Sequence, residues 1–346
     1  MTNTLLEQVS PHGNVQAVVE ADQNVCYFYL FGAEETHIGM KSVWVRNFCK
    51  APAVLDVEGM NSGAPPMNPS PNCRHTKGQA YLKKEQLRVV WLPEGNGAAL
   101  LENDDILAII PPWSGTNGFH GYARDSIGQG QLAWELTTDN VLHQRFADAQ
   151  RYWQAWENET FWPATQGRLI AAIETTFGVH SNYYAIDGGE WPPKAILRIP
   201  MRDSVILVTI GVSLRPQPNV EMYTERPELL RRIELAACLP HDWTDAAIKQ
   251  FASYLSAQTN LPWSQYTWLG SSHTMPCDTW RNSTFTAALL LTSNPHGPNL
   301  DLGEIDGDPV NVLWLLPISE KERQRAMDHG SAEIITSIPP DRWRLA

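Results

Sequence analysis

The sequence predicts an α+β protein with two lobes, a β-rich lobe over residues 1–150 and a second lobe over residues 151–346. A chain of 346 residues is longer than one ordinary domain, for which about 150 residues is a fair expectation. The first 138 residues hold short apolar runs with almost no helical periodicity. Amphipathic helical spacing begins only after them, which marks a change of architecture near residue 150.

The first lobe is predicted to be mostly antiparallel sheet. Its short runs, rich in β-branched and aromatic residues, are separated by Gly, Pro and Asn, the residues that favour turns. A loop is expected over residues 59–75, where Pro, Ser and Asn prevent regular structure. The expected strands are residues 15–20, 25–31, 42–47, 87–92, 98–102 and 106–111, with a hairpin turn at residues 21–24.

Two helices are predicted where the lobes join. Apolar side chains with helical spacing from residue 141 to residue 156 predict a helix that Pro163 stops, and we expect it to act as a stiff connector. A second helix is expected over residues 166–177. Gly178 follows it directly and is a good C-terminal cap.

The second lobe is predicted to have a sheet at its centre. Three apolar runs, residues 195–199, 205–212 and 233–239, are divided by turn residues, and five residues between the first two are few enough for a hairpin. After them we expect a helix over residues 243–260, strands over 284–292 and 311–317, and a final helix to about residue 328. Ser319 and Glu322 have the spacing of a capping box at the start of that final helix.

Two loops of this central sheet contain more charged and aromatic residues than a plain turn requires. Residues 187–193 read DGGEWPP, and residues 215–228 read RPQPNVEMYTERPE. Both combine charge, aromatic rings, Gly and Pro. Loops held on a rigid sheet are where binding residues usually lie, so these two loops are the first candidates for a functional surface.

Composition narrows the class of protein. The net charge of −12 argues against a nucleic-acid partner, because phosphate binding needs clustered Lys and Arg. The N-terminus has no basic leader, and no apolar run approaches the roughly 20 residues needed to span a bilayer. The five scattered cysteines do not predict a disulfide framework. We therefore expect a cytoplasmic protein that binds neither nucleic acid nor membrane, and whose 14 Trp fill cores, line a recognition surface, or do both.

Candidate metal sites are weak. Cys73 and His75 with Cys49 or His37 would supply zinc ligands, but they lack the paired spacing of structural zinc sites. Acids alternate with Gly over residues 301–308, but without the spacing of a calcium loop or its closing Glu, and a solvated turn is the expected reading. No metal and no cofactor is predicted.

One acid pair bears on catalysis. Asp187 and Glu190 stand beside Trp191 and would suit a sugar-cleaving site, although Asp-Gly-Gly-Glu is also an ordinary turn. We found neither a Gly-x-Ser-x-Gly nucleophile elbow nor a phosphate-binding glycine loop. No catalytic residue is assigned, and the protein is predicted not to be an enzyme.

A distributed set of residues matches a known family. The set includes residues 209–213 (Thr-Ile-Gly-Val-Ser), the arginine-flanked strand 231–239, and residues 313–318 followed by Ser319, Glu322 and a closing helix. In order and spacing, residues 160–340 resemble the Suppressor of fused domain. The resemblance implies that residues 151–346 form a Suppressor of fused-like domain, with a mixed sheet and flanking helices.

The resemblance also implies a function. The animal member of the family is a Hedgehog-pathway regulator that binds a transcription factor, is not known as an enzyme, and grips a short peptide as an added strand between two lobes. Bacterial relatives include immunity proteins that neutralise toxins. The first half looks like the region that accompanies the domain in bacterial relatives, and the chain lacks the long acidic insertions of the animal protein, so the bacterial type is favoured.

These observations together predict a non-enzymatic protein-binding protein, an immunity protein of a polymorphic toxin system that holds a toxin or peptide segment in a cleft between its lobes. Two alternatives remain open: a hydrolase that uses Asp187 or Glu190 as acid or base, and a structural component of an assembly. The predicted partner-binding residues are Asp187, Glu190 and Trp191 from one side, and Arg215, Glu221, Tyr223 and Arg226 from the other.

Overall fold

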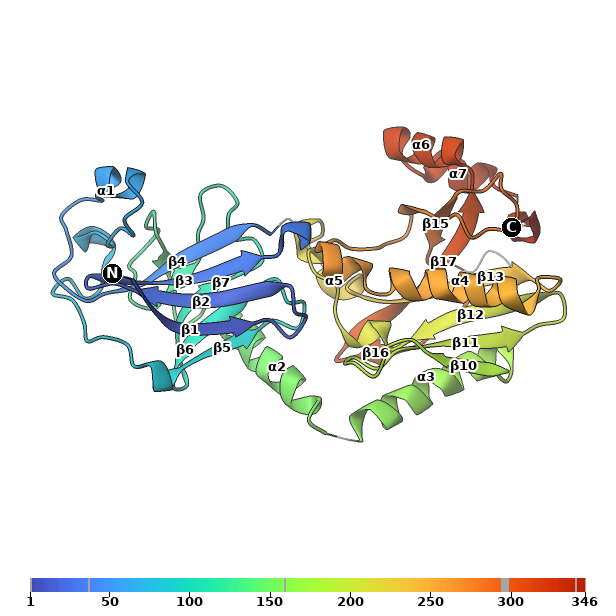
Figure 1. Ribbon diagram of the computed structural model, residues 1–346, viewed down its shortest axis with the longest axis horizontal. Helices are drawn as coiled ribbons and strands as arrows, with labels where there is room; N and C mark the ends of the chain where they lie inside the picture. The colour runs from blue at the N-terminus through green and yellow to red at the C-terminus, as the bar shows by residue number, and fades with distance from the viewer. Residues whose placement is uncertain (1, 37, 159, 294–298, 340, 346) are drawn as a thin grey trace. The chain divides into compact units, whose positions relative to one another are not determined.

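The computed structural model describes residues 2–36, 38–158, 160–293, 299–339 and 341–345. The chain divides into two compact units (Figure 1). The first holds residues 1–157 and the short segment 263–266, and the second holds residues 158–262 and 267–346. Each unit has its own sheets and its own apolar core, so each is described by itself.

The first unit is built on two sheets. The four-stranded antiparallel sheet has the order β1 (Asn3–Val9), β2 (Val15–Ala21), β3 (Val25–Gly32) and β4 (Met40–Asn47). The five-stranded sheet has the order β5 (Leu87–Trp91), β6 (Ala98–Glu102), β7 (Asp105–Ile110), β8 (Tyr122–Ala123) and β9 (Trp134–Glu135), with β8 and β9 parallel. One apolar cluster takes Phe28 and Trp44 from the first sheet and Leu107 from the second, so the sheets pack face to face.

The strand predictions for this half are confirmed, since each of the six expected runs is a strand with ends shifted by at most two residues. β1, β8 and β9 were missed. The side chains of β1 are partly or fully exposed and alternate only weakly between apolar and polar, and β8 and β9 are two residues long. The expected loop 59–75 holds two short helical turns, α1 (Val57–Asn61) and a 3-10 turn at Ser70–Asn72. Of the expected loop, only residues 59–61 and 70–72 were therefore wrongly placed.

The helix α2 (Leu142–Ala155) covers the other face of the five-stranded sheet. Its Leu142, Phe146 and Ala149 join an apolar cluster with residues of β5, β6 and β7. The prediction that Pro163 stops this helix is wrong. α2 ends at Ala155, and Pro163 lies in the first turn of α3 (Phe161–Phe177), where the missing proline N–H costs no helical hydrogen bond.

The second unit is organised around one mixed sheet. Its path is β10 (Asn182–Ala185), β11 (Ala195–Pro200), β12 (Ser204–Ile210), β13 (Arg232–Pro240), β17 (Asp308–Ile318), β15 (Ala287–Leu291) and β14 (Thr274–Pro276). β13 and β17 are parallel, the other neighbours are antiparallel, and β16 (Glu304–Ile305) pairs with β17. The predicted α+β class with a mixed sheet is confirmed.

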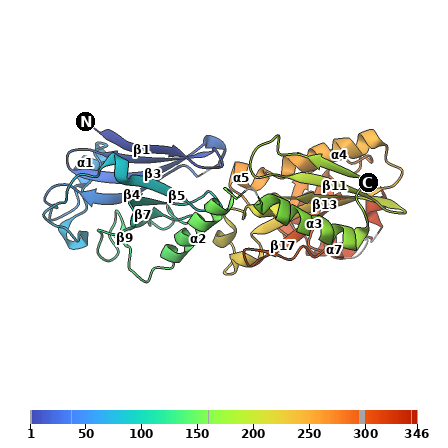
Figure 2. The same ribbon diagram turned by 90° about the horizontal axis from the view of Figure 1, so that it is seen from below.

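Helices flank this sheet, and Figure 2 shows α3 lying across it. Every residue of β12 and β13 is buried, as expected for strands covered on both faces. Apolar residues of α3 and of α4 (Asp245–Gln258) are buried, and Phe177 of α3 packs edge-on against Trp314 of β17. Two further helices of this unit are α6 (Glu320–His329) and α7 (Ala332–Ser337), while α5 (Leu261–Gln265) begins in this unit and has residues 263–265 in the first unit.

The predicted helix caps are confirmed. Gly178 ends α3 at a φ of 92°, a conformation that favours glycine, and its N–H donates to the carbonyl of Glu174. Ser319 and Glu322 form the capping box of α6. The Ser319 hydroxyl accepts from the Glu322 N–H, and the Ser319 N–H donates to the Glu322 carboxylate at 2.8 Å.

Candidate functional site

The candidate surface consists of two loops of the second unit, residues 186–194 between β10 and β11 and residues 211–231 between β12 and β13. They meet at Gly211. Its φ is 94°, and a Cβ added there would lie 2.1 Å from the carbonyl oxygen of Pro193. Only glycine allows this close approach, so the Gly of the Thr-Ile-Gly-Val-Ser motif holds the two loops together.

Asp187 shapes the first loop. One of its carboxylate oxygens accepts from the Gly189 N–H at 2.7 Å, and the other accepts from the Lys194 N–H at 2.9 Å. Gly188 and Gly189 both have positive φ, as this tight turn requires. With both oxygens occupied by backbone donors, Asp187 is arranged to fix the turn, and it presents the exposed Glu190 at the tip.

Trp191 and Arg215 bring the two predicted sides into contact. The Arg215 guanidinium carbon lies 6.0 Å from the centre of the Trp191 ring, within the range of a cation–π interaction. Arg215 is buried, and its Nη2 lies 3.4 Å from the Asn260 side-chain oxygen. Lys194 donates to the same oxygen at 2.5 Å. Burial, together with the nearby Arg215 charge, lowers the pKa of Lys194 to about 8.

A buried carboxyl group on β13, that of Glu234, holds the start of the second loop. Glu234 of β13 is fully buried and accepts four hydrogen bonds, from the Thr209 hydroxyl, the Gly211 N–H, and the N–H and hydroxyl of Ser213. Burial raises the pKa of Glu234, although these donors pull it the other way. Sequence reasoning missed Glu234. A single acid inside the apolar run 233–239 was the available signal.

An arginine pair fixes the other end of the same loop. Asp308 is only 2% exposed. It accepts from Arg231 at 2.7 and 2.8 Å and from Arg232 at 3.0 Å. Arg232 also donates to Asp306 and to the carbonyls of Ser213 and Leu214. The acidic run 301–308 was expected to be a solvated turn, and this is wrong at Asp308, because the two arginines hold it in the interior.

The second loop carries several exposed apolar side chains. Tyr223 is 71% exposed, and its ring centre lies 5.9 Å from that of Trp268. Met222 and Leu229 of the same loop are also exposed. Arg226 pairs with Glu228 at 3.2 Å on the surface, and Glu221 is half-buried. Large exposed apolar side chains grouped on one loop are typical of a surface that another protein covers.

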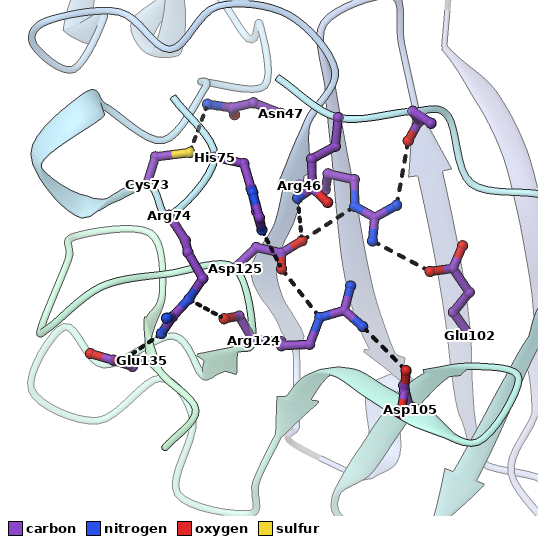
Figure 3. Close-up of polar contacts among 12 residues, drawn as sticks. Arg46, Asn47, Cys73, Arg74, His75, Glu102, Asp105, Arg124, Asp125 and Glu135 are labelled. Carbon is purple, nitrogen blue, oxygen red and sulfur yellow. Dashed lines mark hydrogen bonds and ion pairs between the residues drawn. The ribbon is translucent and has the colours of Figure 1, made fainter. Parts of the chain in front are cut away.

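In the first unit, the candidate zinc ligands point to different neighbours (Figure 3). The Cys73 sulfur accepts from the Asn47 amide at 3.8 Å, and the His75 ring lies 3.7 Å from Asp125. Cys49 contacts Asn24 and Met67, and His37 lies outside the described residues. Among the residues that the structure describes, no three His, Cys, Asp or Glu side chains form a group able to hold a metal.

Asp125 is the centre of this polar cluster. It is buried and lies within 3.3 Å of Arg46 and 3.2 Å of Arg124, and it accepts from Gln79 at 2.6 Å (Figure 3). Burial alone would raise the pKa of Asp125, but Arg124, Gln79 and Arg46 outweigh it and bring the pKa below its ordinary value. The cluster therefore ties β4 to the loops around residues 75 and 125, and it acts as internal support.

Within the described part of the chain, every helix is too short or too polar to cross a bilayer.

Comparisons with known proteins found one matching family model and structures that are similar in part. No curated protein sequence matches this chain. Two structures with 15% and 16% identity are similar in part: "the Sufu-Fu complex crystal structure" (TM-score 0.34, covering 49% of this chain and 81% of that one) and "Crystal structure of Drosophila Suppressor of Fused" (TM-score 0.27, 38% and 35%). The family model described as Suppressor of fused protein matches residues 190–342. The matched residues contain the whole of the second candidate loop and residues 190–194 of the first.

Proposed function

We propose that this chain is a non-enzymatic protein-binding protein that acts in the cytoplasm as an immunity protein, neutralising a toxin by binding it through the two loops of its second unit. The observation that carries the proposal is the set of exposed apolar side chains on the second loop, Met222, Tyr223 and Leu229, on a domain of the Suppressor of fused family. That domain is known for protein binding. Fold alone does not determine function, so the proposal depends on the loops.

The two loops combine fixed bases with exposed side chains, as a binding surface requires. Gly211, Glu234 and the Arg231–Arg232–Asp308 cluster fix their bases through buried contacts. The exposed Met222, Tyr223 and Leu229 side chains are accessible to a partner. A rigid base lowers the entropy lost when a partner binds, and an exposed Tyr beside a Trp is the kind of side-chain pair that dominates binding energy.

Asp187, Glu190, Trp191, Arg215, Glu221 and Arg226 stay predictions as partner-binding residues. Two of them would act indirectly in this proposal. Asp187 would orient the loop that carries Glu190 and Trp191, and the buried Arg215 would hold Trp191 in place. We expect the direct contacts to come from Tyr223 and its exposed neighbours.

The test uses the toxin encoded beside the gene for this chain, produced as an inactive variant and titrated against the purified protein by calorimetry. We expect Tyr223→Ala to weaken binding by at least tenfold, the effect of losing a hot-spot aromatic of about 2 kcal/mol or more. Met327→Ala is the control, because Met327 is an exposed apolar residue of the same unit on α6. Equal affinity for wild type and Tyr223→Ala would overturn the assignment of the loop. Failure of the folded wild type to bind the toxin would overturn the immunity role.

A further inference from the structure

Two positively charged side chains lie together where the two candidate loops meet. Lys194 ends the first loop and is 5% exposed, and Arg215 lies near the start of the second loop and is 7% exposed. They share one acceptor, because Lys194 donates to the Asn260 side-chain oxygen at 2.5 Å and Arg215 Nη2 lies 3.4 Å from the same atom. Two like charges are therefore buried around a neutral amide.

The Lys194 ammonium lacks a full counter-charge. In the part of the chain that the structure describes, it forms no ion pair, and the Asn260 oxygen is its one hydrogen-bond acceptor, although an ammonium group has three donors. Buried charges in proteins are normally paired. Burial first, and then the charge of Arg215, lowers the pKa of Lys194 to about 8. The free protein therefore holds an incompletely satisfied cation at this point.

The acids around Lys194 are committed to other groups or exposed. Asp187, Glu234 and Glu190 favour its charged form only at a distance. Both oxygens of Asp187 accept from backbone N–H groups, and Glu234 accepts four hydrogen bonds of its own. Glu190 is exposed. The C-terminal end of α4, just before Asn260, adds only a partial negative charge. A carboxylate supplied from outside would complete the cluster.

We propose that Lys194 and Arg215 bind the side-chain carboxylate of an Asp or Glu on the partner polypeptide. This contact rests on the proposed function and belongs to the same two loops. The carboxylate would replace the Asn260 oxygen as the shared acceptor and would accept charge-assisted hydrogen bonds from both cations. Asn260 is exposed, so its side chain can rotate away from the cations beneath it.

The energetics favour such a contact. Most of the cost of a buried ion pair is the removal of its charges from water. Lys194 and Arg215 are already buried in the free protein, so only the incoming carboxylate has to lose water. The cation–π contact with Trp191 helps to keep Arg215 in position before the partner arrives.

Asn260→Asp places a carboxylate at the shared acceptor and tests the site without a partner. Asp has almost the same shape as Asn, so it should pair with both cations. We expect a higher urea midpoint at pH 7, and a pKa of Lys194 closer to its ordinary value, followed by ¹³C NMR of the lysine ε-methylene groups. The C-terminal end of α4 disfavours a new acid, so the helix would not itself produce this gain.

A double-mutant cycle with Lys194→Met is the control for this measurement. Without the Lys194 ammonium, Asn260→Asp should raise the urea midpoint much less, because only Arg215 remains as a partner. An unchanged or lower midpoint for Asn260→Asp, or the same gain in the Lys194→Met background, would overturn the proposal.

Calorimetry with the inactive toxin variant tests the contact itself. Near pH 8 about half of the Lys194 side chains are neutral, so pairing with a carboxylate should take up as much as about half a proton per complex. Titrations in phosphate and in Tris, whose protonation enthalpies differ, measure this uptake. Lys194→Met should remove the uptake and weaken binding by about tenfold or more. Asn260→Asp should weaken binding similarly, because its own carboxylate occupies the site.

Matched variants decide the outcome. Lys249→Met removes an exposed lysine of α4 and should bind with the same proton uptake as wild type. Among toxin variants with single Asp→Asn or Glu→Gln changes, one should lose the uptake. If the toxin binds but no such variant loses the uptake, or the uptake persists in Lys194→Met, the contact is refuted while the proposed function stands. If the folded wild type does not bind the toxin, the proposed function fails, and the Asn260→Asp cycle still decides whether the site accepts a carboxylate.

Discussion

Replacing Asp308 with Asn tests whether the arginine cluster holds the second unit together. Asn has almost the same shape as Asp, so the change opens no cavity. It removes the negative charge between Arg231 and Arg232, and an amide NH₂ replaces one of the two oxygens that accept from their guanidinium groups. The effect measured is therefore electrostatic.

The expected magnitude follows from burial. The side chains of Asp308 and Arg232 are 3% and 4% exposed, and that of Arg231 is 29% exposed. Breaking a buried ion pair by removing one partner costs about 3–5 kcal/mol, since the remaining charge stays in the interior. Arg232 keeps Asp306 and two backbone carbonyls as acceptors, and Arg231 can reach water. We therefore expect a loss at the lower end, about 3 kcal/mol.

The assay must report on the second unit alone, because a chain of two units need not unfold in one step. Amide hydrogen exchange in β13 and β17, followed by mass spectrometry, gives the free energy of opening these strands. A loss of about 3 kcal/mol speeds exchange there by roughly a hundredfold, since each 1.4 kcal/mol is a factor of ten. Amides of β2 and β3 in the first unit should exchange as in wild type.

The control is Asp242→Asn. Asp242 pairs with Arg281 at 3.0 Å, but both side chains are about half exposed, so the expected cost is about 0–1 kcal/mol. The expectation fails if the free energy of opening β13 in Asp308→Asn is higher than in wild type, or lies within about 1 kcal/mol of that in Asp242→Asn. The arginine cluster would then not be a main support of the loop.

Three further changes test other parts of the structure. The pKa of Asp125 is lowered in the folded state, so the Asp125 carboxylate stabilises the fold fully above its unfolded-state pKa near 4, and this stabilisation is lost as pH falls through the folded-state pKa. Asp125→Asn should therefore reduce the loss of first-unit stability at acid pH, measured as the free energy of unfolding against pH. The pKa of Lys194 is lowered to about 8 in the folded state, so between pH 8 and roughly 10.4 the unfolded chain binds more protons than the folded chain, and the stability of the fold should rise with pH. Urea midpoints measured at pH 7.5 and pH 10 should show this rise in wild type and not in Lys194→Met. Ser319→Ala should cost about 1 kcal/mol through the lost cap of α6, and an unchanged urea midpoint would contradict that role.

Most of the secondary structure could be predicted from local patterns. The alternation of apolar residues in β2 and β3, the hairpin between β11 and β12, and the Ser319–Glu322 capping box each depend on residues close together in the chain. Predictions failed where local signals were ambiguous. The exposed side chains of β1 hide its pairing, and Pro163 reads as a helix stop although proline is equally at home in a first turn.

The candidate site could be predicted only in part. The composition of the two loops and the resemblance around residues 209–213 pointed to one region of the second unit, and the family model matches residues 190–342, which include residues 209–213. They did not reveal that Arg215 is buried, that both carboxylate oxygens of Asp187 accept from backbone N–H groups of its own loop, or that Tyr223 is largely exposed. Burial depends on what packs over a residue, and no local pattern contains that information.

The sequence by itself determined the α+β class and six of the nine strands that the structure describes in the first unit. The tertiary structure alone decided the long-range polar contacts. Glu234 meets Ser213, Arg231 and Arg232 meet Asp308, and Gly211 meets the carbonyl of Pro193. The physical reason is distance along the chain. Helix caps and hairpins form between near neighbours, whereas Asp308 lies 77 residues from Arg231, and its partner is chosen only when the parallel strands β13 and β17 come together.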